Sequence, residues 1–271
     1  IKTRQEIIIW TDVSIYSMRF IGAPFVFGFD LVTQGVSIAS PNAAINANNA
    51  VYFMDKDNFY IYNGSIQSLP CTVRAYVFED INDRQEFKIF AARNAQFNEI
   101  MWFYCSSSSD EIDRYVIYNY LENNWSIGQL SRTSWDDSGT SSVTPISTSS
   151  NYIYNHEVGY DDDGSAMSAY VESADFDIED GNNFAFINRI IPDILFTGSA
   201  SNPIVTYTLK TRSSGSGSLV SQSTASVGPT TENSDVRARG RQMRVRIENS
   251  DASNGWRLGD VRFDIRQDGR R

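Results

Sequence analysis

The sequence is poor in the two residue types that most often carry metal sites and covalent catalysis. It has two cysteines, Cys71 and Cys105, and one histidine, His156. A secreted scaffold held by disulfides would be denser in cysteine, so we expect two reduced, unbridged thiols rather than a disulfide. A lone histidine has no second histidine with which to share a zinc ion, and most histidine-based catalysis is excluded. We therefore expect no catalytic residue and no metal site.

Long apolar runs and the common nucleotide-binding loops are also missing. No stretch of about 18 apolar residues exists, which excludes a transmembrane helix, and no apolar region follows the first residues as in a signal peptide. The motifs Gly-x-Gly-x-x-Gly, Gly-x-x-x-x-Gly-Lys and Gly-x-Ser-x-Gly are absent, so we expect no cofactor. The chain opens on Ile1 rather than methionine, which predicts processing or a longer parent polypeptide.

Charged residues are scarce, at 21% of the chain, and they are unevenly distributed. The net charge is −10, yet from residue 231 onward ten arginines face seven acidic residues. The first 230 residues therefore carry −13. An acidic body releases no counterions from a nucleic-acid backbone, so we expect no general nucleic-acid binding across this surface.

Strand-forming residues dominate the first part of the chain. Runs rich in Ile, Val, Tyr, Phe and Trp alternate with clusters of Asn, Asp, Gly and Ser. The aromatic centres of four such units, Trp10, Phe53, Phe103 and Tyr154, are 43, 50 and 51 residues apart. A period of about 40–50 residues with several strands per unit is typical of a β-propeller, and an irregular antiparallel sandwich is the alternative. Residues 73–81 predict one short helix.

The composition changes after Asp161-Asp162-Asp163-Gly164. We expect an all-β protein with a propeller-like domain over residues 1–165, in which only four units are recognisable, and an antiparallel β-sandwich-like domain over residues 166–271. Two strands near the end, 242–248 and 260–266, alternate apolar and charged residues, which predicts a paired sheet with one buried face. The residues expected in that core are Met243, Val245, Ile247, Val261, Phe263 and Ile265, capped by Trp256 from the connecting loop.

The opposite face of these two strands is rich in arginine. A solvated face with cross-strand pairs such as Arg246 and Asp264 is the simpler interpretation. Arginine is enriched where planar bidentate pairing is needed, and interleaved acids allow self-complementary pairing. We therefore predict an interface between identical subunits rather than a phosphate-binding surface. The predicted interface residues are Arg237, Arg239, Arg241, Arg244, Arg246, Arg262, Asp264 and Arg266.

Three weaker candidate sites have simpler interpretations. Asp161-Asp162-Asp163-Gly164 offers carboxylates to Ca²⁺ but lacks the alternate spacing of an EF-hand loop, so a solvated linker is favoured. His156-Glu157 is half of an acid–base pair without a nucleophile motif, so a structural histidine is favoured. Among 33 acids some carboxylate pair suited to glycoside hydrolysis arises by chance. Trp and Tyr at strand positions favour core packing over sugar stacking.

A resemblance covers almost the whole chain. The segments that carry it are Trp10-Thr11-Asp12, residues 20–28 (FIGAPFVFG), residues 57–64 (DNFYIYNG), residues 113–120 (DRYVIYNY) and the ending 255–271, which opens Gly-Trp-Arg-Leu-Gly and closes Arg-Arg. The set resembles the C-terminal part of the tail nozzle proteins of short-tailed bacteriophages, also called head-stabilisation or tail tubular proteins. The ending is the most specific segment, followed by residues 57–64.

This resemblance implies a structural virion protein and not an enzyme. The chain would be one of six identical subunits in a ring below the portal and adaptor, in contact with tail fibre or spike proteins. The ring would close the channel that holds the genome and conduct viral DNA at ejection without reading its sequence. The protein would be located in the virion tail after assembly in the host cytoplasm. The alternative is a receptor- or glycan-binding β-propeller of a phage tail, and a polysaccharide-cleaving glycosidase is the third hypothesis.

Overall fold

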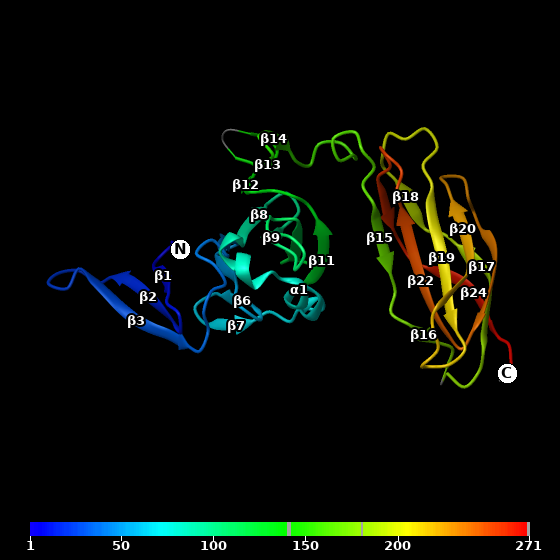
Figure 1. The fold of residues 1–271 in the computed structure, drawn as a ribbon, viewed down its shortest axis with the longest axis horizontal. Coiled ribbons are helices and arrows are strands. Elements are labelled where there is room, and N and C mark those ends of the chain that lie inside the picture. Colours follow the sequence, from blue (N-terminus) through cyan, green and yellow to red (C-terminus); the bar gives the residue numbers. More distant parts are fainter. Residues whose placement is uncertain (140–141, 180, 270–271) are drawn as a thin grey trace. The chain divides into compact units, whose positions relative to one another are not determined.

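The structure, a computed structural model, describes residues 1–139, 142–179 and 181–269. The chain divides into two compact units, Ile1–Val158 and Gly159–Arg271 (Figure 1). The sequence analysis placed this boundary after residue 165. The division lies earlier because Asp161 already belongs to the second unit, where its carboxylate accepts hydrogen bonds from the backbone and the hydroxyl of Ser253. Arg270 and Arg271 lie outside the described residues.

The first unit consists of four antiparallel sheets, each formed by strands that follow one another along the chain. The first sheet contains β1 (Ile7–Trp10), β2 (Ser14–Phe20) and β3 (Phe27–Gln34), and the second contains β4 (Ala44–Ala47), β5 (Ala50–Met54), β6 (Phe59–Tyr62) and β7 (Ile66–Ser68). The third contains β8 (Phe90–Asn94), β9 (Glu99–Tyr104), β10 (Arg114–Asn119) and β11 (Asn124–Gln129), and the fourth contains β12 (Ser134–Asp136), β13 (Ile146–Ser149) and β14 (Tyr152–Asn155).

These sheets pack against one another in chain order. Ile8 and Ile15 of the first sheet share a core with Phe53 of the second. The second and third sheets meet around a larger core that includes Trp102. The third and fourth meet where Trp135 packs against a core around Phe103. The all-β class is thus confirmed. No sheet closes into a barrel within the described residues, so the propeller stays a prediction.

Two short helices connect the second and third sheets. The helix predicted over residues 73–81 is confirmed as α1 (Arg74–Asp80), whose Val77 is buried in the shared core. A 3₁₀ helix, η1 (Asp83–Lys88), follows, and the side chain of Asn82 accepts a hydrogen bond from its second backbone N–H. None of the helices in the described parts of the chain has the length and apolar character that a bilayer span requires.

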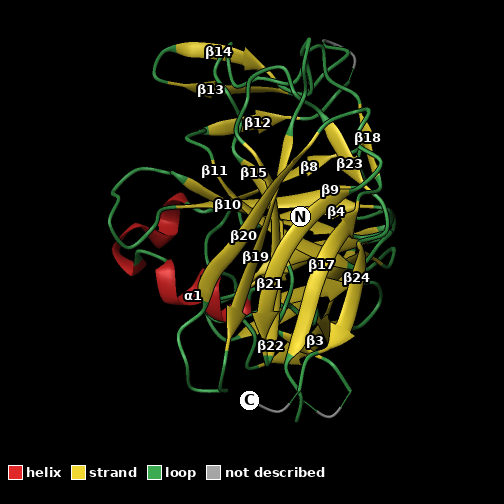
Figure 2. Cartoon of the chain, turned by 90° about the vertical axis from the view of Figure 1, so that its right-hand side faces the viewer, coloured by secondary structure: helices red, strands yellow, loops and turns green. Residues whose placement is uncertain are grey.

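The second unit is built from two antiparallel sheets with one core between them (Figure 2). Buried side chains of β19 and β22 on one sheet and of β17 and β21 on the other form this core. The larger sheet has the order β15 (Ala169–Glu172), β22 (Gln242–Asn249), β19 (Val205–Arg212) and β20 (Val220–Val227), with β16 (Phe176–Asp177) also on β22. The other sheet has the order β21 (Ser234–Gly240), β17 (Ala185–Ile191) and β24 (Arg262–Gln267), and β18 (Ile194–Phe196) pairs with β23 (Trp256–Leu258).

The predicted pairing of the two alternating C-terminal strands is wrong, because β22 and β24 lie in different sheets. β22 is flanked on both sides, and its three apolar residues are buried as predicted. β24 is an edge strand that pairs only with β17 among the described residues, so Ile265 stays 37% exposed and Val261, which precedes the strand, stays 41% exposed. Phe263 and Trp256 are half-buried and pack against the core, Trp256 from β23 rather than from a loop.

Candidate functional site

A network of alternating charges covers the outer face of the larger sheet in the second unit. Strand alternation buries the apolar residues of β22 and turns Arg244 and Arg246 to the opposite face. The register places Lys210 of β19 directly opposite Arg244, and Arg212 opposite Gln242. Cations that face one another across a ladder repel, so this face is stable only with acids between them.

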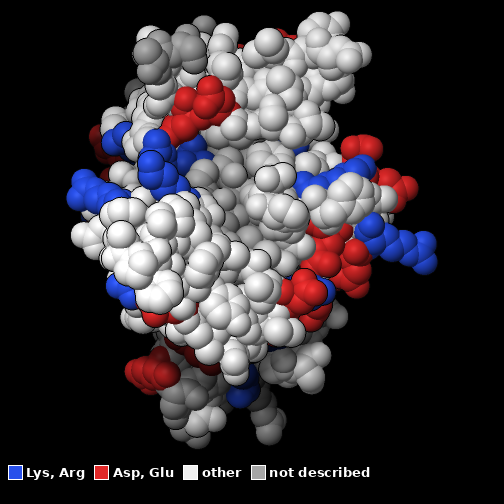
Figure 3. Space-filling view, turned by 90° about the vertical axis from the view of Figure 1, so that its left-hand side faces the viewer, with Lys and Arg blue, Asp and Glu red and all other residues white. Residues whose placement is uncertain are grey.

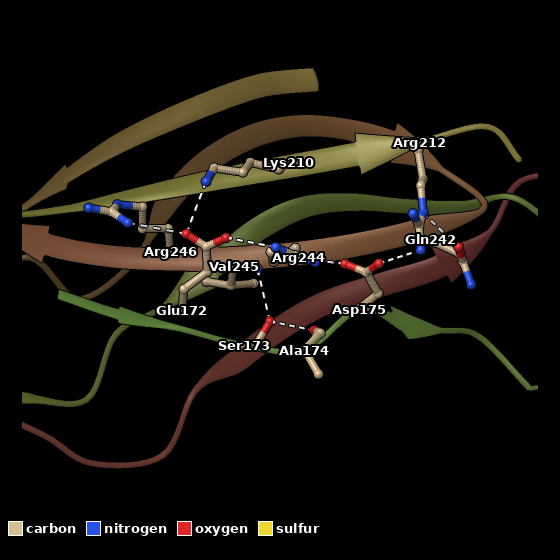
Figure 4. A network of polar contacts seen from close by, with 10 residues as sticks. All are labelled: Glu172, Ser173, Ala174, Asp175, Lys210, Arg212, Gln242, Arg244, Val245 and Arg246. Atoms are coloured by element: carbon tan, nitrogen blue, oxygen red, sulfur yellow. Dashed lines mark hydrogen bonds and ion pairs between the residues drawn. The ribbon is translucent and has the colours of Figure 1, made fainter. Parts of the chain in front are cut away.

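Glu172 of β15 and Asp175, just after it, supply that negative charge (Figure 4). The Glu172 carboxylate accepts hydrogen bonds from Lys210 at 3.0 Å, Arg244 at 3.1 Å and Arg246 at 3.3 Å. Asp175 accepts from Arg244 at 2.8 Å and from Arg212. We name these residues the charge network, together with Glu248, which accepts from Arg246 at 2.8 Å: Glu172, Asp175, Lys210, Arg212, Arg244, Arg246 and Glu248.

The electrostatic effect of the charge network is concentrated on its acids. Burial of Glu172 opposes its ionisation, but hydrogen bonds from Lys210, Arg244 and Arg246 outweigh that term and lower the pKa of its carboxyl to about 2. The hydrogen bond from Arg244 is the main cause that lowers the pKa of Asp175. Both acids therefore stay ionised well below neutral pH. The guanidinium of Arg246 also lies 3.8 Å from the centre of the Tyr170 ring, which adds a cation–π contact.

The arginines predicted as one interface stripe are divided between the two outer faces of the sandwich-like unit. Only Arg244 and Arg246 lie in the charge network, and both pair with acids of their own chain. The predicted pair of Arg246 with Asp264 is wrong, because the two strands are in different sheets and Asp264 accepts from Asn188 at 3.1 Å.

The other predicted interface residues belong to β21, β24 and the turn before β22. Arg239 pairs with Asp268, and Arg262 pairs with Asp260 at 3.0 Å and Asp193 at 3.3 Å. The remaining three are Arg241, which lies 5.3 Å from the Phe184 ring centre, Arg266, which lies 4.9 Å from the Phe186 ring centre, and exposed Arg237, which makes no ion pair with any described residue.

Comparison with known proteins finds no relative: no family model matches the chain, and no curated protein matches it. The site is therefore assessed on its own geometry, in which the charge network is a closed set of ion pairs on a rigid sheet.

The weaker candidates of the sequence analysis have structural partners. Ser147 Oγ lies 2.6 Å from His156 Nε2, and Arg132 Nε lies 3.1 Å from the same atom, while the Trp135 ring packs at 4.6 Å. No group of three or more metal-ligating side chains occurs in the described ranges. The two cysteines are free, as predicted. Burial raises the pKa of the Cys105 thiol to about 11.

The first unit contains a recess of about 810 Å³ that the sequence analysis did not identify. The first strand of every sheet contributes to its lining: β1 through Trp10, β4 through Ala44, β8 through Phe90 and β12 through Trp135. Lys88, which pairs with Glu111 at 2.9 Å, and Asn42 add polar groups. The Nε1 atom of Trp10 is buried and has no hydrogen-bond partner among the described residues.

A second feature that the sequence analysis missed is a carboxyl pair at the end of the third sheet. Glu99 opens β9, and burial raises the pKa of its carboxyl to about 7, with smaller contributions from the charges of Glu157 and Glu122. Burial also raises the pKa of Glu157, although Asn94 donates a hydrogen bond to it at 2.8 Å. Glu99 is therefore largely protonated at pH 6 and largely charged at pH 8.

We expect the stability of the first unit to fall as pH rises from 5 to 8. The pKa of Glu99 is higher in the folded protein, about 7, than its ordinary value of 4.5, so its stabilising contribution is complete below pH 4.5 and is lost as pH rises through 7. Solvent screens this half-buried group, which limits the effect to about 1 kcal/mol. Urea unfolding at several pH values should show the slope in the wild type and in Glu79→Gln, an exposed control, but not in Glu99→Gln. An equal slope in all three proteins would contradict the assignment.

Proposed function

We propose that the chain is a structural subunit of a bacteriophage tail nozzle, in which a ring of six copies closes the DNA channel below the portal and adaptor and conducts the genome at ejection. The observation that carries the proposal is the spread of the nozzle-like segments over both units. Residues 57–64 form β6 and the turns on either side of it, and residues 255–267 contain β23 and β24. The resemblance is thus seated in ordered strands of each unit.

Two features of the molecule support this role. The four sheets of the first unit present their first strands to a common recess, which is how propeller blades are arranged around an axis. The net charge of −10 suits a channel wall along which DNA slides, because an acidic surface does not retain a phosphate backbone. Head-to-tail contacts between identical subunits close into rings when the rotation closes.

Electron microscopy of the purified protein tests the ring. We expect class averages with sixfold symmetry and a particle mass of six 30.5 kDa chains. Particles of another rotational symmetry would change the stoichiometry, whereas subunits that stay monomeric both in solution and in intact virions would contradict the nozzle role.

The recess of the first unit favours one alternative, a glycan-binding propeller of a phage tail. Trp10, Phe87, Phe90 and Trp135 all line it and are all partly exposed, beside polar groups such as Asn42. Aromatic faces with a few hydrogen-bonding groups around them suit the amphipathic surface of a sugar.

A glycan array separates the two functions. Under the alternative, wild-type protein binds a defined set of glycans, and Trp10→Ala weakens that binding by about tenfold, the equivalent of one lost aromatic contact. Leu121→Ala, at an exposed position away from the recess lining, is the control that should bind like the wild type. A wild type that binds no glycan, or a Trp10 variant that binds equally well, would remove this alternative.

A further inference from the structure

The first sheet has two faces of different character. Its inner face packs against the second sheet through Ile8 and Ile15, which are fully buried. Its outer face is apolar over all three strands, because every residue that alternation turns outward in the paired region is apolar. The register arranges this outer face into three rows: Ile9–Tyr16–Leu31, Ile7–Met18–Phe29 and Phe20–Phe27. We name these eight residues the apolar hairpin face.

The apolar hairpin face is open to solvent. Phe20 is 72% exposed, Phe29 is 62% exposed, and Leu31 and Phe27 are about half exposed. Phe25, at the tip of the hairpin, is 74% exposed. Figure 3, which views the molecule from the side where β2 and β3 project in Figure 1, shows a broad area without charged side chains. Soluble proteins rarely leave a continuous apolar surface of this extent uncovered, so the face marks an interaction site.

The other face of the same hairpin shows what kind of partner fits. Arg19 pairs there with Asp30, and both side chains are more than half exposed. Ile21 lies over Gly28, where an added Cβ would approach its side chain to 3.2 Å. A bilayer would surround the hairpin and would desolvate this ion pair, at a high cost in free energy. A second sheet covers one face only, leaves the ion pair in water, and therefore fits the hairpin better than lipid.

We propose that the partner is a second copy of this chain, with two apolar hairpin faces packed against each other about a twofold axis. The eight side chains expose an area on the order of 800 Å², since a large aromatic side chain presents about 150–250 Å². This matches the roughly 800 Å² that each partner buries in a standard stable interface. Two sheets pack face to face at about 10 Å with their apolar side chains interdigitated.

Charge selects the same contact. Each copy carries −10 overall, so two copies repel across most of their surfaces. The apolar hairpin face carries no charged residue and needs no compensating ion, and a twofold contact brings the same face to itself. The inference rests on this face alone and not on the proposed function: the contact is separate from the head-to-tail contacts that would close a ring and from the arginines of the second unit.

Sedimentation equilibrium of the full chain tests the proposal. We expect wild-type protein to self-associate in pairs, and the double variant Phe20→Ser, Phe29→Ser to raise the dissociation constant by about 100-fold, because large aromatic anchors dominate interfaces of this kind. Leu121→Ser, an equally exposed apolar residue outside the face, is the matched control and should associate like the wild type. Circular dichroism should show the same fold in all three proteins.

Hydrogen exchange of the wild type supplies a measurement that needs no variant. Amides of residues 16–31 should become more protected as protein concentration rises, while those of residues 146–155 should not change. A wild type that stays monomeric at tens of micromolar would overturn the proposal. So would association that the double variant leaves unchanged, or a monomer that binds phosphatidylcholine vesicles through Phe20 and Phe29, which would make lipid the partner.

Discussion

Replacing Trp102 by alanine is expected to lower the free energy of unfolding of the first unit by about 3–5 kcal/mol, which is the usual cost of truncating a fully buried large aromatic residue. Trp102 of β9 is fully buried where the second and third sheets meet. Its ring centre lies 4.9 Å from that of Phe59 on β6 and 6.1 Å from that of Trp125 on β11. Its indole N–H donates to the backbone carbonyl of Ala43 at 3.0 Å.

The alanine variant loses three terms at once. It leaves a cavity that the surrounding rings cannot fill without leaving their rotamers, it removes the stacking on Phe59 and Trp125, and it orphans the buried carbonyl of Ala43. Since all three terms join one sheet to the next, the effect measures how far the sheets depend on each other.

Calorimetry or denaturation followed by circular dichroism would measure this effect. The first unit should unfold at lower temperature or lower denaturant, and the transition of the second unit should stay where it is, because the two units have separate cores. Tyr152→Ala on β14 is the control: its side chain is 68% exposed, so the change should be below about 0.5 kcal/mol. A shift of less than 1 kcal/mol for Trp102→Ala would mean that the two sheets do not share a core.

The strands of this protein are predictable from its sequence because they follow a local rule. Alternation of apolar and polar residues identifies β22, and an apolar run bounded by turn residues identifies β9. The partners of a strand depend on the whole chain. The segments 242–248 and 260–266 carry the same pattern, yet one is central in its sheet and the other is at an edge of a different sheet. Alternation contains no information that separates these cases.

The sites illustrate the same limit. The arginines of β22 were visible in the sequence, but their acids, Glu172 and Asp175, lie about 70 residues earlier and come close only when β15 pairs with β22. The recess of the first unit unites residues from β1 to β12, which no local window contains. A signal for the apolar hairpin face was present, because residues 20–29 include no charge, and its meaning appeared only once the inner face of the sheet was known to be occupied.

Neutralising Glu172 is expected to destabilise the second unit by about 1–2 kcal/mol at pH 7 and to remove part of its sensitivity to acid. The full difference between the ordinary pKa of 4.5 and the folded value of about 2 corresponds to roughly 3 kcal/mol, and solvent screening on this outer face reduces it. In Glu172→Gln, Arg244 keeps Asp175 and Arg246 keeps Glu248, but Lys210 loses its only ion-pair partner among the described residues while it still faces Arg244 across the ladder.

The pH dependence has a definite sign. Because the pKa of Glu172 is lower in the folded protein, its contribution is complete above pH 4.5 and is lost as pH falls through 2. Denaturant unfolding between pH 7 and 2 should therefore show wild type and Glu172→Gln converging in acid, with the gap open only above about pH 4. Asp235→Asn is the matched control, since Asp235 is 85% exposed and pairs with Arg189 at 3.6 Å, and it should differ from wild type by less than 0.5 kcal/mol. A constant gap at all pH values would show that the glutamine variant acts through packing, and the charge network would then contribute shape to this face rather than electrostatic stability.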